Sequence, residues 1–128
     1  MPTGLPSADL DARLATFDDL FLQLHSGDPG AAGTANVSTA TTVRKQITLG
    51  TPDTDSGQRR ARNDAIIRWE GSDVTGTQSN THASLWTLAS GGSFKRSVEL
   101  SSPVSLTAGQ PAEIPINGAV LREGPLAS

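Results

Sequence analysis

Apolar residues recur along the chain with two periods, one typical of a helix and one typical of strands. Near the N-terminus, Leu10, Leu14 and Phe17 are four and three residues apart, which places them on one helical face. Ser7 precedes this stripe, so its hydroxyl is expected to accept a hydrogen bond from a free N–H group of the first turn. The pattern predicts one short helix that lies against a larger body.

From residue 20 onward, short runs of alternating apolar and polar residues replace the helical pattern. Such alternation is typical of half-buried strands, and Gly, Pro, Asn and Asp residues separate the runs. Gly91-Gly92 between two runs predicts a hairpin, and Asn117-Gly118 is a second strong turn signal. Pro111 and Pro115 indicate an edge strand, because proline cannot donate to a strand ladder. The predicted strands cover residues 20–25, 43–49, 65–69, 81–88, 94–100, 104–106, 112–116 and 119–122.

Short strands at this spacing, together with one helix, are typical of a mainly β fold. We expect a single-domain antiparallel β-sandwich of about seven or eight strands with one short N-terminal helix, spanning residues 1–128. Residues 1–6 and 122–128 are expected to be flexible arms that a partner orders. The polar segments 50–58 and 71–80 are predicted to be loops.

The composition excludes several classes of function. The 128 residues include no cysteine, which rules out disulfides, thiol catalysis and cysteine-ligated zinc. A net charge of −3 gives no general attraction to nucleic acid or to anionic lipid. No apolar run approaches the ~20 residues that cross a bilayer, and Met1–Pro6 does not resemble a signal peptide. We therefore expect synthesis in a cytosol, with no nucleic-acid partner and no membrane partner.

Candidates for catalysis and metal binding are few. His82 lies two residues from Ser84 on one face of a predicted strand, but no oxyanion-hole motif accompanies the pair. His25 and Asp28 supply only two ligands, whereas zinc normally takes three or four. Residues 53–57 resemble part of a calcium loop that lacks its bidentate acid, so a solvated loop is favoured. The glycine-rich segments lack the residues of a phosphate-binding loop. We expect no catalytic residue, no metal and no cofactor.

Two groups of residues are candidates for contact with a partner. Arg59, Arg60 and Arg62 form the one basic cluster, which can contact an acidic partner surface or remain a solvated loop before a strand. Trp86 lies in the middle of a predicted strand and is expected to fill the core. Trp69 lies beside a glycine-containing loop, so core and interface roles are both open. The candidate partner-binding residues are Arg59, Arg60, Arg62 and Trp69.

A further set of residues resembles a known family. The segment Leu24-His25-Ser26-Gly27-Asp28-Pro29-Gly30, followed by Asn36-Val37 and Arg44-Lys45-Gln46, is similar to small bacteriophage virion proteins described as tail-fibre or minor tail proteins. Later pieces follow in the family's order, among them residues 81–86 and 91–94. Together the matches cover most of residues 20–121. The chain departs from the family pattern because Asn36 is followed directly by Val37, without the family's glutamate, and because Val43 stands where an aromatic residue is common.

The signature segment has the chemistry of a strand end and a tight turn. Pro29 restricts its own φ, and Asp28 can close a turn with its side chain. His25 is expected to hydrogen-bond across this turn or to the hairpin that carries His82. The segment is therefore interpreted as architecture. The predicted structural turn motif consists of His25, Gly27, Asp28, Pro29 and Gly30.

The resemblance implies a non-enzymatic virion structural protein, synthesised in the host cytoplasm. It would be an accessory subunit on the virion exterior, either of the minor tail or fibre type or a capsid decoration. Repeated contacts with tail or major capsid subunits, in a homo-oligomer or in many copies per particle, would add up through avidity. The alternative is a carbohydrate-binding module for host-surface glycans that uses Trp69 and the loops at 50–58 and 71–80.

Overall fold

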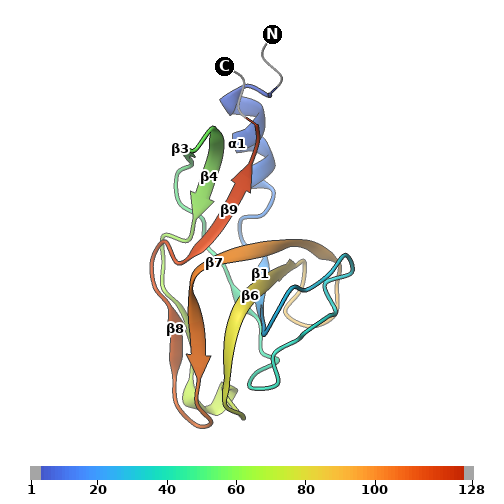
Figure 1. Ribbon diagram of the computed structural model, residues 1–128, viewed down its shortest axis with the longest axis vertical. Helices are drawn as coiled ribbons and strands as arrows, with labels where there is room; N and C mark the ends of the chain where they lie inside the picture. Colours follow the sequence, from blue (N-terminus) through green and yellow to red (C-terminus); the bar gives the residue numbers. More distant parts are fainter. Residues whose placement is uncertain (1–3, 126–128) are drawn as a thin grey trace.

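The computed structural model describes residues 4–125 and confirms a mainly β fold with one α-helix (Figure 1). The nine strands of this part of the chain form two antiparallel sheets. The larger sheet has the strand order β2-β1-β6-β7-β9-β4-β3, and β5 pairs with β8 in the smaller one. The elements are α1 (Ser7–Ala15), β1 (Phe21–His25), β2 (Lys45–Gln46), β3 (Asp53–Asp55), β4 (Gln58–Arg62), β5 (Ile67–Trp69), the 3-10 turn η1 (Gly71–Asp73), β6 (Gln78–Trp86), β7 (Phe94–Leu106), β8 (Ala112–Ile114) and β9 (Ala119–Glu123).

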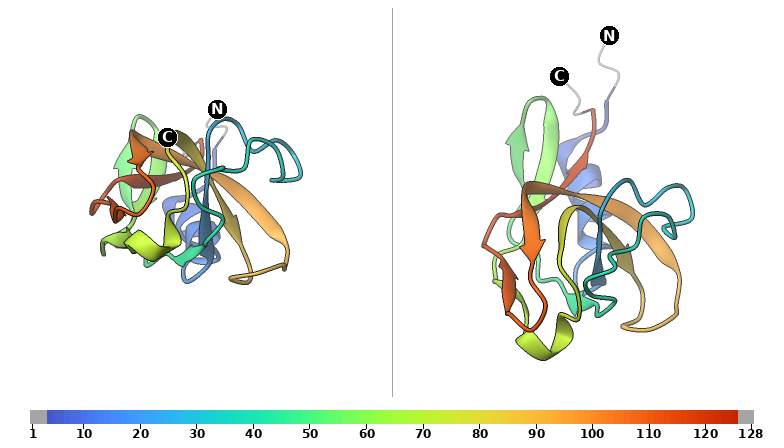
Figure 2. Two further views of the ribbon diagram at one scale, coloured as in Figure 1. Left: turned by 90° about the horizontal axis from the view of Figure 1, so that it is seen from below. Right: turned by 60° about the horizontal axis from the view of Figure 1, so that its bottom comes forward.

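Strand β7 connects the two halves of the large sheet. It is 13 residues long, pairs with β6 along most of its length, and pairs with β9 through Glu99 and Leu100. The β6–β7 register shifts between Asn80 and His82, and irregularities of this kind bend strands. In Figure 1, β7 crosses the molecule and then turns to run beside β6. The β5–β8 pair lies beside β7, on the side away from the long loop between β1 and β2 (Figure 2).

The core lies between the bent sheet and the β5–β8 pair. Trp69 of β5 is its largest fully buried side chain, and Nε1 of Trp69 donates to the carbonyl oxygen of Val43 at 2.9 Å. Each leucine or isoleucine that leaves water here contributes about 1.5–3 kcal/mol relative to an exposed position. The large buried aliphatic residues around Trp69 are Leu14, Leu22, Leu24, Ile47, Leu85, Leu106, Ile114 and Leu121.

Helix α1 covers β9 and β4 with the predicted stripe. Leu10 and Leu14 are buried, and Phe17 packs partly buried against the core just after the helix. The prediction that Ser7 caps the helix is wrong. Pro6 is the N-cap residue, no side chain caps this end, and the carbonyl oxygen of Pro6 accepts two of the first N–H groups.

The predicted loop at 50–58 is instead a hairpin of β3 and β4. Its two-residue turn consists of Ser56 and Gly57, whose φ angles are 51° and 77°. Positive φ at both positions suits the tightest hairpin turn, whose twist matches that of the strands. Arg59, Arg60 and Arg62 therefore lie on a strand, which removes the alternative of a solvated loop for them.

The structure confirms the predicted hairpin at residues 91–92, and it corrects the predicted hairpin at residues 117–118 and part of the predicted terminal arms. The Gly91-Gly92 hairpin joins β6 to β7, as predicted. A turn forms at Asn117-Gly118, but it leads from β8 to β9 in the other sheet instead of closing a hairpin. Strand β9 continues to Glu123, and Leu5 N donates to Pro125 O at 3.0 Å, so residues 4–6 and 122–125 are part of the fold. The remaining arm residues, 1–3 and 126–128, lie outside the described residues.

Candidate functional site

The signature segment folds into a turn that packs against the sheet. Asp28 Oδ1 accepts the N–H of Gly30 at 2.9 Å, and the side-chain nitrogen of Asn36 donates to Asp28 O at 3.0 Å. The N–H of Ser26 donates to Asn36 O at 2.8 Å, which closes the loop at its base. The loop therefore has its own network of hydrogen bonds and needs no ligand to hold its shape.

His25 makes hydrogen bonds in both of the expected directions. Its Nδ1 lies 2.8 Å from the carbonyl oxygen of Ala35, and its Nε2 lies 2.7 Å from Ser84 Oγ on the neighbouring hairpin. A carbonyl only accepts, so Nδ1 carries the proton and Nε2 accepts from the Ser84 hydroxyl. Trp86 Nε1 also donates to Ser84 Oγ, at 2.8 Å. Three side chains thus form one directed chain of hydrogen bonds.

Burial holds His25 in its neutral form. The side chain is completely buried, and this desolvation lowers the pKa of His25 below its usual 6.5. The hydrogen bond to Ala35 opposes the shift, whereas the nearby His82 and Arg44 add to it. A neutral imidazole that two neighbours hold in place is a structural element, and it leaves neither nitrogen free for catalysis or for metal binding.

Gly33 allows the loop to lie on the β6–β7 hairpin. Its φ is 73°, and a methyl group at this position would lie 2.4 Å from Cδ1 of Phe94. Phe94 contacts Trp86 at a centroid distance of 5.6 Å, and the guanidinium of Arg44 stacks over the Trp86 ring at 4.2 Å. Arg44 also donates to the carbonyl oxygens of residues 88 and 91. These contacts fix the hairpin tip to the loop.

The structure decides the open question for Trp69 and corrects the expectation that Trp86 fills the core. Trp69 is completely buried, so it is not accessible to a partner or to a sugar ring in this structure. Trp86 is half-buried at the surface, where Arg44 covers its ring. The glycan-binding alternative therefore loses its proposed aromatic residue, Trp69.

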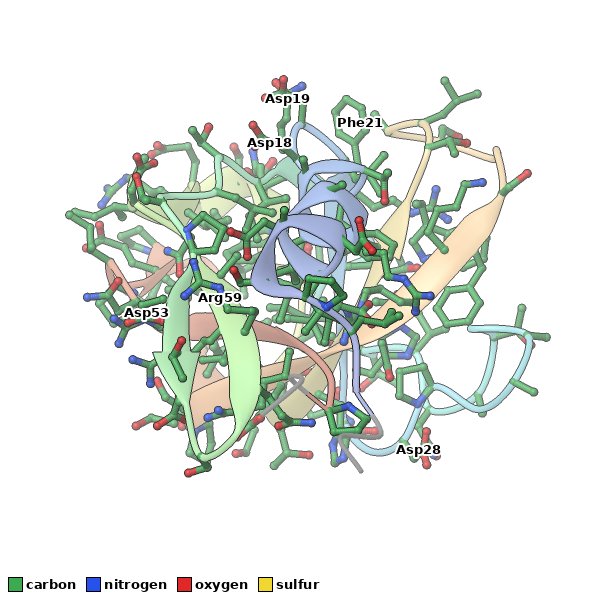
Figure 3. The ribbon with its side chains drawn as sticks, turned by 90° about the horizontal axis from the view of Figure 1, so that it is seen from above. Asp18, Asp19, Phe21, Asp28, Asp53 and Arg59 are labelled. Carbon is green, nitrogen blue, oxygen red and sulfur yellow. The ribbon has the colours of Figure 1, made fainter. Side chains whose placement is uncertain are left out.

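The basic cluster is neutralised within the chain. Arg59 donates through two nitrogens to both carboxylate oxygens of Asp11 on α1, at 2.8 and 3.0 Å. Arg60 binds Asp53 of β3 in the same two-pronged way, at 3.0 and 2.8 Å. In Figure 3, Arg59 lies between the helix and the hairpin strand that carries Asp53. A contact between these arginines and an acidic partner remains a prediction.

The same network continues across the outer face of the sheet. Arg62 lies 3.5 Å from Asp53, while Arg122 of β9 contacts Asp55 and also Glu99 of β7, the latter at 3.2 Å. Hydrogen bonds from Arg60 and from Arg122 lower the pKa of Asp53 and of Asp55, respectively. Both aspartates therefore form ion pairs with arginines, and these pairs account for two acidic residues on one short strand.

His82 and Ser84, the candidate catalytic pair that the sequence analysis disfavoured, form no hydrogen bond with each other. Its Nδ1 lies 2.7 Å from Thr81 Oγ1, while Ser84 is bound to His25 and Trp86. His82 lines an open polar hollow of about 290 Å³ between the signature turn and the β6–β7 hairpin, together with Asp28. Within residues 4–125, no group of three or more His, Asp or Glu side chains is arranged to hold a metal ion.

A second hollow lies between α1 and the chain that enters the β3–β4 hairpin. This α1 pocket has a volume of about 180 Å³. Its walls are mostly apolar and come from α1, from the segment after Thr48 and from β4. They include Leu14, Ala15, Leu49, Pro52 and Ala61. Asp11 and Asp18 lie at its rim.

Sequence reasoning missed the α1 pocket and the acidic partners of the arginines. Asp11 is 48 positions from Arg59 in the sequence, so only the folded chain brings them together. One local signal did exist, because Ser56-Gly57 is a turn dipeptide between two runs of equal polarity. It would have predicted the hairpin and, through it, the pairing of Asp53 with Arg60.

Comparison with protein families assigns this mainly β chain to the class of bacteriophage fibre proteins. The matching family model is described as Podophage GP4 fiber I protein gp80 and covers residues 11–122. The chain belongs to this family. The match confirms the resemblance to phage tail-fibre proteins. No curated protein matches the sequence. In the described part of the chain, α1 is too short and too polar to cross a membrane.

Proposed function

We propose that this chain is a non-enzymatic accessory subunit of a phage fibre on the virion exterior, acting through repeated contacts with other virion proteins. The family supports a structural role in a tail fibre. The observation that best supports a non-enzymatic role is the burial and hydrogen bonding of the residues that could act in catalysis. Ser84, the serine of the candidate catalytic pair, is buried and hydrogen-bonded to the buried His25 instead of to His82.

The surface of the molecule is consistent with assembly in many copies. The free edge of the large sheet at β3 is only three residues long and carries Asp53 and Asp55, which discourages edge-to-edge pairing. The contacts that remain available are side-chain surfaces and loops. Weak contacts of this kind are effective when a symmetric particle repeats them.

Quantitative mass spectrometry of purified virions tests this proposal. We expect the chain in the particle at a copy number that is small compared with the major capsid protein and consistent with the symmetry of a tail appendage. Hundreds of copies per particle would instead indicate a capsid decoration. Absence from washed virions would contradict the structural role itself.

A further inference from the structure

The α1 pocket has the size of a single side chain. Small-molecule sites usually measure about 300–1,000 Å³, whereas this pocket measures about 180 Å³. It has room for roughly six water molecules at their liquid volume of about 30 Å³ each. One large apolar side chain would displace this water and contact Leu14, Leu49 and Ala61.

Two aspartates line the pocket, Asp11 and Asp18, and two more, Asp19 and Asp64, lie next to lining residues. Asp18 is fixed there, because its Oδ1 accepts the N–H groups of Leu49 at 2.8 Å and of Asp19 at 3.0 Å. Asp64 packs beside the lining residue Gly50, because a methyl group on Gly50 would be 3.1 Å from Asp64 Cβ. Figure 3 shows Asp18 and Asp19 close together beside α1.

These carboxylates have no basic partner in the described part of the chain. Asp18, Asp19 and Asp64 form no ion pair there, whereas both oxygens of Asp11 are taken by Arg59. An apolar socket with an acidic rim is complementary to an apolar side chain flanked by lysine or arginine.

We propose that the α1 pocket receives one large apolar side chain from a basic segment of a neighbouring virion protein. The inference rests on the proposed function, because it places the chain beside other virion proteins. A second copy of this chain fits the rim less well. Seven of its ten basic residues are already ion-paired internally, and Arg44 is held on Trp86. Only Arg13 and Lys95 remain without such a contact in residues 4–125.

Two tryptophan substitutions on α1 distinguish the effect of filling the pocket from the effect of a bulky side chain elsewhere on the helix. Ala15 is exposed and lines the pocket, whereas Ala12 is exposed on the same helix and does not line it. Phages carrying Ala15→Trp or Ala12→Trp are purified, and the chain is quantified against the major capsid protein. Both purified variants are first compared with the wild type by circular dichroism and thermal unfolding.

We expect Ala12→Trp to enter virions at the wild-type level and Ala15→Trp at least tenfold less. Equal incorporation of the two folded variants would overturn the proposal for the pocket while leaving the proposed function intact. Absence of the wild-type chain from virions would instead remove the proposed function, so the two failures are distinguishable.

Purified virions also test the role of the negative charge beside the pocket and the identity of the segment that enters it. Changing Asp18, Asp19 and Asp64 together to asparagine keeps their hydrogen-bond acceptors and removes the negative rim, so incorporation should fall. Asp28→Asn, in the distant signature turn, is the matched control. A photo-crosslinking residue at position 15 should join a basic segment of another virion protein. A crosslink to a second copy of this chain, or no loss of incorporation in the triple variant, would overturn the assignment.

Discussion

The hydrogen-bond chain from Trp86 through Ser84 to His25 makes a quantitative prediction about stability. Ser84 and His25 are both fully buried, and their contact measures 2.7 Å. Ser84→Ala leaves His25 Nε2 as a buried acceptor without a donor, which costs about 1–3 kcal/mol. The N–H of Trp86 lies in a half-buried residue and can turn to water, so its loss adds little.

His25→Leu removes the same hydrogen bond from the other side and leaves Ala35 O without its donor. We expect a similar cost of about 1–3 kcal/mol. In the double variant, the cost of Ser84→Ala disappears because the unsatisfied Nε2 no longer exists. The double variant should therefore be more stable than the sum of the two single effects by about 1–2 kcal/mol.

Urea unfolding at pH 7.5, followed by far-ultraviolet circular dichroism, measures the three free energies. Fluorescence serves as a second probe only, since Ser84→Ala changes the surroundings of Trp86. Ser97→Ala is the matched control, because Ser97 pairs with Ser84 across β6 and β7 but is exposed. Its effect should stay within about 0.5 kcal/mol. Additivity of His25→Leu and Ser84→Ala to within about 0.3–0.5 kcal/mol would refute the reasoning.

Three further predictions concern pH, backbone conformation and charge. The pKa of His25 is lower in the folded than in the unfolded protein, so the stability that neutral His25 contributes is complete above pH 6.5 and is lost as pH falls below that value. His25→Leu should therefore flatten this part of the stability profile in urea unfolding, and an unchanged profile would contradict the effect of burial. Gly33→Ala should lower the free energy of unfolding in urea by about 2–5 kcal/mol, because alanine disfavours the left-handed φ and its methyl group would clash with Phe94. Gly91→Ala should cost only about 1–2 kcal/mol, because Gly91 has a similar φ of 68° but open space around it. Arg59→Met removes the ion pair with Asp11, so it should lower the midpoint temperature of thermal unfolding in calorimetry and make that midpoint less dependent on salt. An unchanged midpoint would contradict the view that this ion pair holds α1 to β4.

Features encoded in short segments of the sequence were predictable. The stripe of Leu10 and Leu14 fixed the buried face of α1, and the Gly91-Gly92 dipeptide located the β6–β7 hairpin. The strand at 112–116 was expected at an edge because of its prolines, and β8 does lie in a two-stranded sheet. In each case the residues that determine the structure are neighbours in the chain, so one sequence contains enough information.

Features that depend on pairing between distant segments were not predictable. The β3–β4 hairpin has almost no apolar alternation, because Asp53, Asp55 and Arg60 are stabilised by one another instead of by the core. The position of a tryptophan within a strand also does not reveal whether its side chain lies on the face that other elements cover. Trp69 is therefore buried by β5–β8 packing, while Trp86 remains at the surface beneath Arg44.

The α1 pocket shows the same limit at the level of function. Its walls come from residues 11–18, 49–52 and 61, which no local motif connects. The family match assigns the chain to a family of phage fibre proteins, but it does not indicate which surface meets a neighbour. We infer that surface from carboxylates that form no ion pair within residues 4–125 and lie beside an apolar hollow, an arrangement that only the folded chain displays.

Cryo-electron microscopy of the intact virion tests the central claim most directly. We expect density for the bent seven-stranded sheet in repeated copies within a tail appendage, with each copy in contact with a different virion protein. Density for this fold only on the capsid lattice, or a particle that lacks it altogether, would contradict the account.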